Sequence, residues 1–328
     1  MALRWAVSGV SDIAIKALAP AVLAHPSAAL AAVYSRSAER GGEFAQRFGI
    51  DTVYTDYHAM LADPAVDLVY VGGEVDRHAP ETLSAAESGK HVLCEKPMAL
   101  DAAECRAMID ACRANGVHLA IAYYRRYYPS VQRLTDLVRA GVLGEVIQAS
   151  IDMSYYRRPL PERDWRTHRA GGGGALMDIG SHRLDVLCGL LGEPSRVAGF
   201  TAHRVHTHWA PDVETLIVEF VGGAHATLRC NWCAGANQDL FTVVGTEAVA
   251  LLGALEEPSF ILRRRGQPDE VVEAGAPAAI THGPLVADLT ERLLAGAAPQ
   301  FDGVAGYQAS RIMDGCYRSA ASGQMVDV

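Results

Sequence analysis

The stretch Cys94-Glu95-Lys96-Pro97 places a lysine between a carboxylate and a proline, directly after the strand-like run 89–93. A lysine at the end of a buried strand costs free energy, because its ammonium group loses water. Burial also makes the pKa of a lysine tunable, so Lys96 could donate a hydrogen bond or a proton near neutral pH. We therefore treat Lys96 as a candidate catalytic group, presented by the turn that Pro97 begins.

Asp178 and His182 form a second candidate pair, four residues apart. On an α-helix this spacing puts both side chains on one face, where a carboxylate can orient an imidazole ring and favour its charged form. Four glycines at 171–174 precede the pair and would let the backbone pass close to a ligand. An ordinary surface Asp–His pair has the same spacing, so the assignment depends on the rest of the chain.

The first 122 residues alternate strand-like and helix-like segments. Strands are predicted at 4–8, 29–34, 52–54, 66–71 and 91–94, and helices at 15–24, 40–48, 57–62 and 79–88. Such alternation predicts a parallel, doubly wound Rossmann sheet, in which ligands bind at the carboxyl ends of the strands. Gly9, Gly72-Gly73 and Glu95-Lys96-Pro97 all follow strands, so we expect them to converge on one crevice.

The turn at residues 9–14 resembles a dinucleotide fingerprint, with Ser11 and Ala14 in place of the second and third glycines. After the second strand there is no acidic residue for a ribose hydroxyl; Ser35, Arg36 and Arg40 stand there instead, and arginines suit a 2′-phosphate. This favours NADP(H) over NAD(H), although a solvated helix start would look similar. The predicted cofactor contacts in this region are Gly9, Val10, Ser11, Asp12, Ile13, Ser35, Arg36, Arg40, Gly72, Gly73, Glu74, His78, Glu95 and Lys96.

Bulk properties narrow the class of protein. The chain has 328 residues, which suggests two domains, and its net charge of −9 argues against nucleic acid or an anionic membrane as the main partner. No apolar stretch approaches the roughly 20 residues of a membrane span. The start of the chain does not look like a signal peptide, and the seven cysteines are odd in number and scattered through apolar segments. We therefore expect a cytoplasmic protein with reduced thiols.

Four stretches together resemble the Gfo/Idh/MocA family of NAD(P)-dependent oxidoreductases. They are the turn 9–14, the run 86–97 that ends in Glu-Lys-Pro, the segment 172–182 with the pattern G-G-G-x-x-x-D-x-G-x-H, and the closing stretch 311–323. They span nearly the whole chain in the family's order. The resemblance implies a Rossmann domain at residues 1–122 and, at 123–328, a substrate-binding and oligomerisation α/β domain with a large, mostly antiparallel open sheet.

The second half of the sequence agrees with this expectation. Strands are predicted at 197–205, 214–220, 224–230 and 241–244, and helices at 178–191, 284–294 and 305–322. The stretch 221–224 reads as a hairpin turn, which makes its flanking strands antiparallel. A broad sheet with one face uncovered by helices would need a partner, so we expect a homodimer or homotetramer.

The resemblance implies hydride transfer at a carbinol or carbonyl carbon. His182 would take the hydroxyl proton in oxidation and return it in reduction, while Lys96 would hydrogen-bond the same oxygen or relay the proton. Which of the two is the acid–base stays open. Asp178 would position the substrate or His182. Of the remaining polar residues, Trp165 and Arg166 look like the family's pair near the nicotinamide ribose, and an anchoring aromatic with a surface arginine is the alternative.

Further polar residues suit substrate hydroxyls. Tyr123, Arg125 and Tyr156 are predicted substrate contacts, although the cluster at 155–158 could equally be a subunit contact. The expected substrate is a sugar, a polyol or a related cyclic compound. The alternatives are a non-catalytic NADP-binding regulator of the same fold, or an oxidoreductase of a non-sugar substrate such as an aromatic diol or a C=N bond. The presence of Lys96, Asp178 and His182 argues against the regulator.

Two features depart from the family pattern or compete with it. Val75 occupies the position where the family often has an asparagine that contacts the cofactor ribose, although His78 matches. A zinc site is the competing interpretation of two further groups, which are His203, His206 and His208, and Cys230 with Cys233. Both stretches read as strands, where residues three apart point to opposite faces, so we expect no metal.

Overall fold

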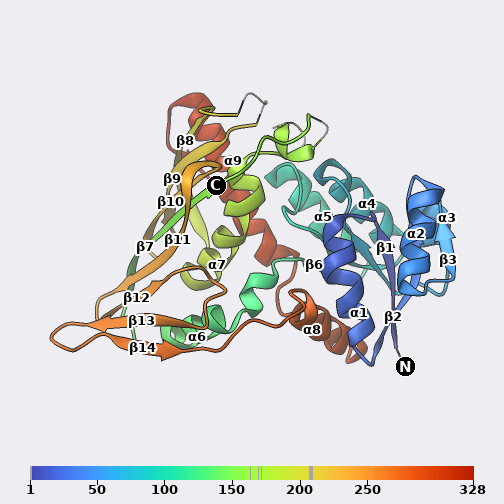
Figure 1. The fold of residues 1–328 in the computed structure, drawn as a ribbon, viewed down its shortest axis with the longest axis horizontal. Helices are drawn as coiled ribbons and strands as arrows, with labels where there is room; N and C mark the ends of the chain where they lie inside the picture. Colours follow the sequence, from blue (N-terminus) through green and yellow to red (C-terminus); the bar gives the residue numbers. More distant parts are fainter. Residues whose placement is uncertain (1, 163, 169, 171, 207–209) are drawn as a thin grey trace. The chain divides into compact units, whose positions relative to one another are not determined.

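The computed structural model describes residues 2–162, 164–168, 170, 172–206 and 210–328. The chain divides into two compact units (Figure 1). The first comprises Met1–Tyr124 and Ala278–Tyr307, and the second comprises Arg125–Pro277 and Gln308–Val328. The sequence-based division at residue 122 leaves 278–307 in the second domain, whereas here this segment packs with the first unit. This segment joins the first unit because its helix, at residues 283–294, packs against the first strand and the first helix of that unit.

The first unit contains a six-stranded parallel sheet in the order β3-β2-β1-β4-β5-β6. Its strands are β1 (Leu3–Ser8), β2 (Ala28–Tyr34), β3 (Thr52–Tyr54), β4 (Leu68–Val71), β5 (His91–Cys94) and β6 (Leu119–Ile121). All four residues of β4 are buried, as in strands covered on both faces. The predicted doubly wound sheet is confirmed, and its order changes direction between β1 and β4, where such folds bind their ligands.

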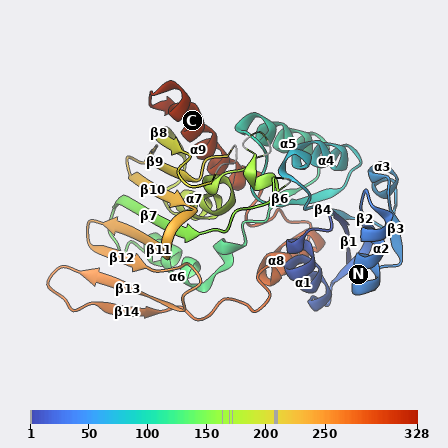
Figure 2. The ribbon, with the colours of Figure 1, turned by 45° about the horizontal axis from the view of Figure 1, so that its top comes forward.

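Helices cover both faces of this sheet, with α4 and α5 on one side and α1 and α8 on the other (Figure 2). The helices are η1 (Ala14–Leu18), α1 (Ala19–Ala24), α2 (Ala38–Phe48), α3 (Tyr57–Leu61), α4 (Val75–Glu87), α5 (Ala102–Ala114) and α8 (Gly283–Leu294). The predicted helix at 15–24 is in two parts, because η1 is a π-helical turn. Leu285, Val286 and Leu289 of α8 are buried, which holds the returning segment on this unit.

The second unit contains a nine-stranded sheet in the order β14-β13-β12-β11-β7-β10-β9-β8-β15. Its strands are β7 (Val146–Tyr156), β8 (Pro194–Ala202), β9 (Val213–Phe220), β10 (His225–Asn231), β11 (Cys233–Gly245), β12 (Ala248–Leu252), β13 (Ser259–Arg264), β14 (Glu270–Glu273) and β15 (Val326–Asp327). Strands β9 and β10 pair antiparallel across the predicted hairpin, whose Gly223 has a φ of 88°. Strand β10 pairs parallel with β7, so the sheet is mixed and mostly antiparallel.

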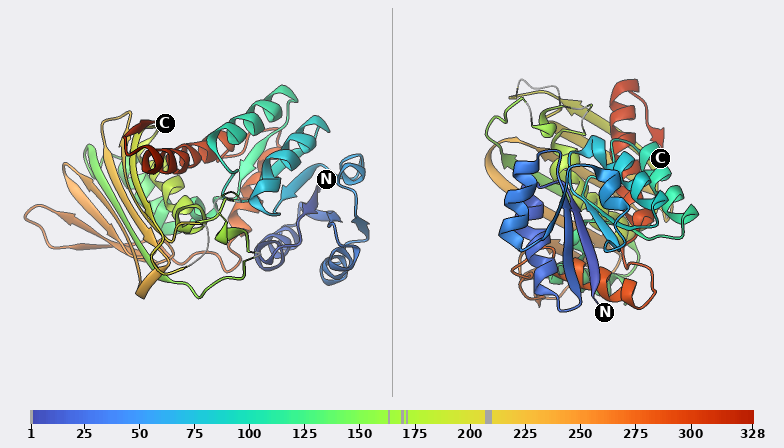
Figure 3. Two further views of the ribbon diagram at one scale, coloured as in Figure 1. Left: turned by 90° about the horizontal axis from the view of Figure 1, so that it is seen from above. Right: turned by 90° about the vertical axis from the view of Figure 1, so that its right-hand side faces the viewer.

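Helices cover only one face of the nine-stranded sheet among the described residues (Figure 3, left). They are α6 (Pro129–Arg139), α7 (Ser181–Leu191) and the long α9 (Gly303–Ser322), which begins in the first unit. Shorter helical turns are η2 (Tyr124–Tyr127), η3 (Trp165–Thr167) and η5 (Leu176–Gly180). Leu216 and Val218 of β9 are buried while Ile217 between them is 52% exposed, the alternation of a sheet covered on one side.

Candidate active site

The first glycine of the nucleotide turn lies against the backbone that follows β4. Gly9 has a φ of 92°, and a Cβ added there would lie 2.6 Å from the backbone nitrogen of Gly73. The N–H of Gly72 donates to the carbonyl of Ser8 at 2.8 Å. Only a residue without a side chain permits this approach. The carboxyl ends of β1 and β4 therefore form one backbone surface, as expected from their order in the sheet.

The end of β2 is a serine-rich turn with one anchored arginine. Ser35 is buried, and its hydroxyl accepts from the backbone N–H of Ser37 at 3.3 Å. Ser37 in turn caps α2 by accepting from the N–H of Arg40 at 3.2 Å. The guanidinium of Arg40 reaches across to the fingerprint turn and donates to the carbonyl of Val10 at 3.0 Å. Arg36 is exposed at the same strand end.

His78 joins the Gly73 turn to the turn after β5. Its side chain is 1% exposed, with Nδ1 3.0 Å from the carbonyl of Pro97 and Nε2 3.3 Å from the carbonyl of Gly73. Burial lowers the pKa of His78, against the opposing effect of these two carbonyls. The ring therefore links two of the three strand ends through their backbones. Val75, at the position of the family's asparagine, is buried, whereas Glu74 before it is exposed.

The Glu95 carboxylate is buried beside Lys96 and has three hydrogen-bond donors. Its Oε1 accepts from the hydroxyl of Tyr70 at 3.0 Å and from Nε2 of His282 at 3.0 Å, and its Oε2 accepts from the backbone N–H of Lys96 at 3.0 Å. Burial would raise the pKa of Glu95, but the hydrogen bond and charge of His282, with the charge of Lys96, hold it below its ordinary value. Lys96 itself is half-buried.

The remaining residues of the fingerprint turn differ in exposure. Val10 is buried, Ser11 and Ile13 are half-buried, and Asp12 is exposed and forms an ion pair with Lys16 at 2.8 Å. The first unit thus brings together, at the carboxyl ends of β1, β2, β4 and β5, every cofactor-contacting residue that the sequence predicts within residues 1–122. This arrangement offers backbone N–H groups, arginines and one lysine at the same edge of the sheet.

Asp178 in the second unit is held by two arginines. Its Oδ2 accepts from Nη1 of Arg157 at 2.8 Å, and its Oδ1 lies 3.2 Å from Nε of Arg166. The carboxylate is 6% exposed. Asp178 lies on η5, a π-helical turn, and His182 lies on the α-helix that follows, so the spacing argument from a single regular α-helix does not describe this segment. His182 is also buried, at 4% exposure.

The glycine run packs against the neighbouring turn of its own chain. A Cβ added at Gly173 would lie 2.4 Å from the carbonyl oxygen of Arg166, and the N–H of Gly174 donates to that carbonyl at 3.2 Å. The predicted reason for these glycines was approach to a ligand, whereas Gly173 allows a close approach to the backbone of residues 166 and 168. Gly171 lies outside the described residues. Trp165 packs under Arg166, whose guanidinium carbon is 4.5 Å from the ring centroid.

The predicted substrate residues lie in different environments. Tyr123 is buried at 2% exposure and belongs to the first unit, whereas Arg125 belongs to the second unit and pairs with Glu256 at 2.7 Å. Tyr156, at the end of β7, is 63% exposed. The sequence did not predict the contact of His282 with Glu95, because the two residues are 187 positions apart in the sequence. No local pattern marks such a contact.

The histidines and cysteines of the competing zinc interpretation do not group as the sequence suggests. Strand β8 ends at Ala202, so the expectation that His206 lies on a strand is wrong. The thiol of Cys230 lies 3.6 Å from Oε2 of Glu214, whereas the ligand atoms of Cys233, His206 and Asp212 lie within 4.8 Å of one another. The Asp212 carboxylate accepts from three backbone N–H groups, of residues 204–206, and thereby holds this turn. His208 lies outside the described residues.

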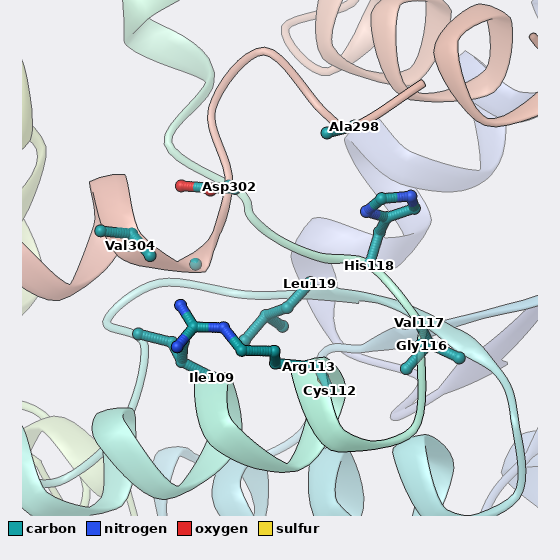
Figure 4. A pocket seen from close by; sticks show the side chains of 11 residues that line it. Ile109, Cys112, Arg113, Gly116, Val117, His118, Leu119, Ala298, Asp302 and Val304 are labelled. Atoms are coloured by element: carbon teal, nitrogen blue, oxygen red, sulfur yellow. The ribbon is translucent and has the colours of Figure 1, made fainter. Parts of the chain in front are cut away.

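A hollow on the first unit lies away from these strand ends. It is bounded by the end of α5, the start of β6 and the start of α9, with Arg113, His118 and Asp302 among its lining (Figure 4). His118 and Leu119 stand at the amino end of β6, whereas Rossmann sheets bind nucleotides at the carboxyl ends. The hollow is therefore separate from the candidate site.

Comparison with known families decides the class of this protein. The model described as "Oxidoreductase family, NAD-binding Rossmann fold" matches residues 3–123, and the one described as "GFO/IDH/MocA C-terminal domain" matches residues 131–251. The chain belongs to the GFO/IDH/MocA family. The predicted resemblance is thereby confirmed, and so is the prediction of an oxidoreductase. Both matched segments follow the same order as the two units, and they include Lys96 in the first and Asp178 and His182 in the second.

Several GFO/IDH/MocA relatives have named activities. The chain is 30% identical over 264 residues, 79% of its length and 77% of the relative's, to a trans-1,2-dihydrobenzene-1,2-diol dehydrogenase of Mus musculus. It is 36% identical over 199 residues, 61% of its length and 60% of the relative's, to "D-xylose 1-dehydrogenase (NADP(+)) 2" of Haloferax volcanii. Among solved structures, aldose-aldose oxidoreductase from Caulobacter crescentus, complexed with glycerol, matches with a TM-score of 0.89, 28% identity and full coverage of both chains.

The fold is shared more widely within the family. Levoglucosan dehydrogenase, solved with NADH and levoglucosan, matches with a TM-score of 0.91 and 23% identity over both complete chains, a likeness that concerns the fold. Among the described residues of the present chain, no helix is long and apolar enough to cross a membrane. All seven cysteines are free thiols, and six of them are buried, as expected from their apolar surroundings.

Proposed function

We propose that this oxidoreductase uses NADP(H) to move a hydride at a carbinol or carbonyl carbon of a sugar, a polyol or a related cyclic compound. The observation that carries the proposal is the set of turns at the carboxyl ends of β1, β2, β4 and β5, where Gly9 lies against Gly73, Arg40 reaches the turn after β1, and Lys96 follows β5. A close backbone approach suits a pyrophosphate, arginines suit a 2′-phosphate, and a lysine suits a reacting oxygen.

The close packing of the turns at these strand ends supports the proposed dinucleotide site. Gly9 and Gly72 leave no room for a side chain, since a Cβ at Gly72 would lie 2.1 Å from the ring of Tyr70. The backbone after β1 would hold the pyrophosphate, and Arg36 and Arg40 would hold the 2′-phosphate. When bound there, the nicotinamide supplies the hydride chemistry. The family includes proteins named for NADP(+) and structures solved with NADH, so Ser35 and Arg36 in place of an acidic residue are the reason to favour NADP(H).

In the proposed mechanism the chain's own residues handle the proton and the charge. Lys96 would hydrogen-bond the reacting oxygen and stabilise negative charge as it develops, and His182 would accept the hydroxyl proton in oxidation and return it in reduction. Asp178, held by two arginines, would orient the substrate or His182. The roles of Lys96 and His182 as acid–base remain alternatives, which the pH profiles of single variants at each position would separate.

The remaining predicted contacts complete the proposal. The cofactor would be lined by Val10, Ser11, Asp12, Ile13, Glu74, Glu95, Trp165 and Arg166. The substrate would be lined by Tyr123, Arg125 and Tyr156. We assign His78 a positioning role, since both of its ring nitrogens lie against backbone carbonyls of the two turns that the cofactor would touch.

A second substrate class is favoured by one relative. The dihydrodiol dehydrogenase matches over 79% of this chain, a larger share than the D-xylose dehydrogenase does. Both activities named in these relatives concern a secondary hydroxyl on a ring or a lactol carbon, which the same lysine and histidine could serve. A trans-dihydrodiol therefore belongs in the first substrate panel beside sugars and polyols.

We also propose that the uncovered face of the nine-stranded sheet forms a homodimer or homotetramer interface. Phe200, Ile217, Leu240 and Val271 project from this face and are 77%, 52%, 45% and 57% exposed. Exposed apolar side chains on one face of a sheet support the proposal of an interaction surface there. Light scattering after chromatography should find an oligomer in the native chain and a smaller species in the variant Phe200→Glu with Ile217→Glu. An unchanged mass would refute this interface.

The proposed function is tested by turnover with NADP⁺ and NAD⁺ against sugars, polyols and a trans-dihydrodiol. Replacing Lys96 by alanine should lower kcat about 10²- to 10⁴-fold, in the range of general acid–base and oxyanion groups, while binding of NADPH persists. Arg47→Ala is the control, because Arg47 is an exposed cation in the last turn of α2 and belongs to none of the predicted contacts. If the protein bound NADPH but turned over none of the substrates in the panel, the non-catalytic NADP-binding regulator would be favoured. Full activity of Lys96→Ala would refute the proposed role of Lys96 in the hydride-transfer reaction.

A further inference from the structure

His282 lies in a buried polar cluster of the first unit, although the chain reaches it only after leaving the second unit at Pro277. The residue is 0% exposed and immediately precedes α8. Its Nε2 lies 3.0 Å from Oε1 of Glu95, and its ring lies 4.9 Å from that of Tyr124. An ionised carboxylate has no proton to give, so Nε2 carries the hydrogen of this bond.

The two oxygens of the Glu95 carboxylate accept hydrogen bonds from different donors. Oε1 accepts from His282 and from the hydroxyl of Tyr70, whereas Oε2 accepts from the backbone N–H of Lys96. A buried carboxylate is stable in its ionised form only where such donors replace water. His282 is the donor that can also carry a positive charge. Without it, burial would dominate and favour the protonated acid.

Other titratable groups surround Glu95. Tyr70 on β4 and Cys94 on β5 are buried, and burial raises the pKa of each well above its ordinary value, so both are neutral at neutral pH. His78 on α4 has a pKa lowered by burial, despite the nearby charges of Glu95 and Glu81. Among these neighbours, His282 and Lys96 are the groups whose interactions lower the pKa of Glu95.

We propose that His282 is a positioning residue for Lys96: it keeps the buried Glu95 carboxylate ionised and oriented, and that carboxylate holds the backbone of Lys96 and favours its ammonium form. His282 acts through Glu95 and touches no reacting atom. The assignment of Lys96 to catalysis rests on the proposed function, but the linkage of His282, Glu95 and Lys96 can be measured without substrate.

The chain offers an unusually clean probe, because its only lysines are Lys16, Lys90 and Lys96. Reductive ¹³C-dimethylation of the full-length protein therefore gives three lysine signals besides that of the N-terminal amine. Lys→Arg variants at each position assign them. We would titrate the Lys96 signal from pH 5 to 11 in the native chain, in His282→Ala, in His282→Gln and in the double variant His282→Ala with Glu95→Gln.

In the native chain the Lys96 signal should show no inflection between pH 6 and 8 that arises from Glu95. In His282→Ala a new inflection should appear in about that range, since a buried glutamate without a partner can titrate near neutral pH. His282→Gln, which retains a donor at the Nε2 position, should suppress it, and the double variant should lack it because glutamine does not ionise. A merely structural role would instead let water in and return Glu95 to its ordinary, more acidic range.

Glu95→Gln alone provides a second measurement if His282→Ala does not fold. Removing the negative charge should lower the pKa of Lys96 by about 1 unit or more, equivalent to a roughly tenfold change in its protonation constant. A folded His282→Ala without the new inflection, or an unchanged Lys96 pKa in Glu95→Gln, would overturn the proposal. Full turnover in Lys96→Ala would refute the proposed function while leaving this linkage intact, so the two failures are distinguishable.

Discussion

The guanidinium of Arg40 donates a hydrogen bond to the backbone carbonyl of Val10 at 3.0 Å, although 30 residues separate the two in the sequence. The contact fixes a positive charge, carried on α2, at the turn after β1. Arginine held in this way loses less conformational freedom when it binds a phosphate. In the proposed complex with NADP(H), Arg40 would therefore be a pre-positioned partner for the 2′-phosphate.

Replacing Arg40 by alanine should weaken NADPH binding about 10- to 100-fold and leave NADH binding nearly unchanged, because one charge-assisted hydrogen bond is lost only with the phosphorylated cofactor. Fluorescence titration of both cofactors measures the ratio. Arg47→Ala, in the last turn of the same helix, is the matched control and should change neither affinity. Equal losses for NADPH and NADH would contradict the assignment.

Gly9→Ala should abolish cofactor binding and lower the melting temperature. The position has a positive φ, and the new Cβ would meet the backbone of Gly73 at 2.6 Å, so strands β1 and β4 would have to separate. Gly42→Ala is the control: it lies within α2 with nothing near its Cβ, and alanine there should stabilise by about 0.5–1 kcal/mol. Thermal melts and NADPH titrations of both variants decide the matter, and native-like binding by Gly9→Ala would exclude this geometry.

Arg157→Gln should lower kcat about 10- to 100-fold with little effect on NADPH affinity, because Asp178 would keep only Arg166 and lose a charge-assisted hydrogen bond. The exposed neighbour Arg158 provides the control variant Arg158→Gln, expected to behave like the native enzyme. A melt is needed alongside the kinetics, since Arg157 also stacks on Trp232 at 5.0 Å. Similar kinetics for both variants would argue against a role for this ion pair.

Glu214→Gln should make stability less dependent on pH. Burial raises the pKa of Glu214 from 4.5 to about 8. Between these values the folded chain holds a proton that the unfolded chain releases, so this contribution is fully present below pH 4.5 and is lost as the pH rises through 8. The native free energy of unfolding should fall by up to about 1 kcal/mol per pH unit over this window.

Glutamine mimics the protonated acid, so Glu214→Gln should match the native chain at pH 5 and exceed its stability at pH 8. Urea denaturation at several pH values measures the slope. Glu219→Gln lies on the same strand, where Glu219 pairs with Arg196 outside the core, and it should retain the native slope. A slope unaffected by Glu214→Gln would place the titrating group elsewhere.

Most of the Rossmann unit could be predicted because its signals are local, although helix α5 and strand β6 were not predicted. Parallel strands buried on both faces give short apolar runs, and the intervening helices give apolar residues at helical spacing. The antiparallel pair β9–β10 was likewise visible as two alternating strands around Gly222-Gly223. Strands β7 and β12–β14 were not predicted. They lie in the middle and at one edge of a sheet with one exposed face, and their sequence patterns are mixed.

Residues of the candidate site that belong to a local sequence motif could be predicted. Residues that reach the site only through tertiary packing could not. Lys96, Asp178, Gly9 and Arg40 stand in recognisable patterns. No local pattern marks the contacts of the two arginines with Asp178 or the contact of the His282 imidazole with Glu95. The π-helical turn that carries Asp178 and the loop that carries His206 show the same limit, since both replace a regular element that the sequence alone favours.

The sequence by itself determined the family, the doubly wound sheet and the strand ends at which chemistry would occur, because side-chain period and glycine position act within a few residues. Tertiary structure alone decided which distant groups complete the site. Residues 278–307 rejoin the first unit because the buried face of α8 packs there, and this return brings His282 to Glu95. Such pairings depend on how buried surfaces meet, and that information is distributed over the whole chain.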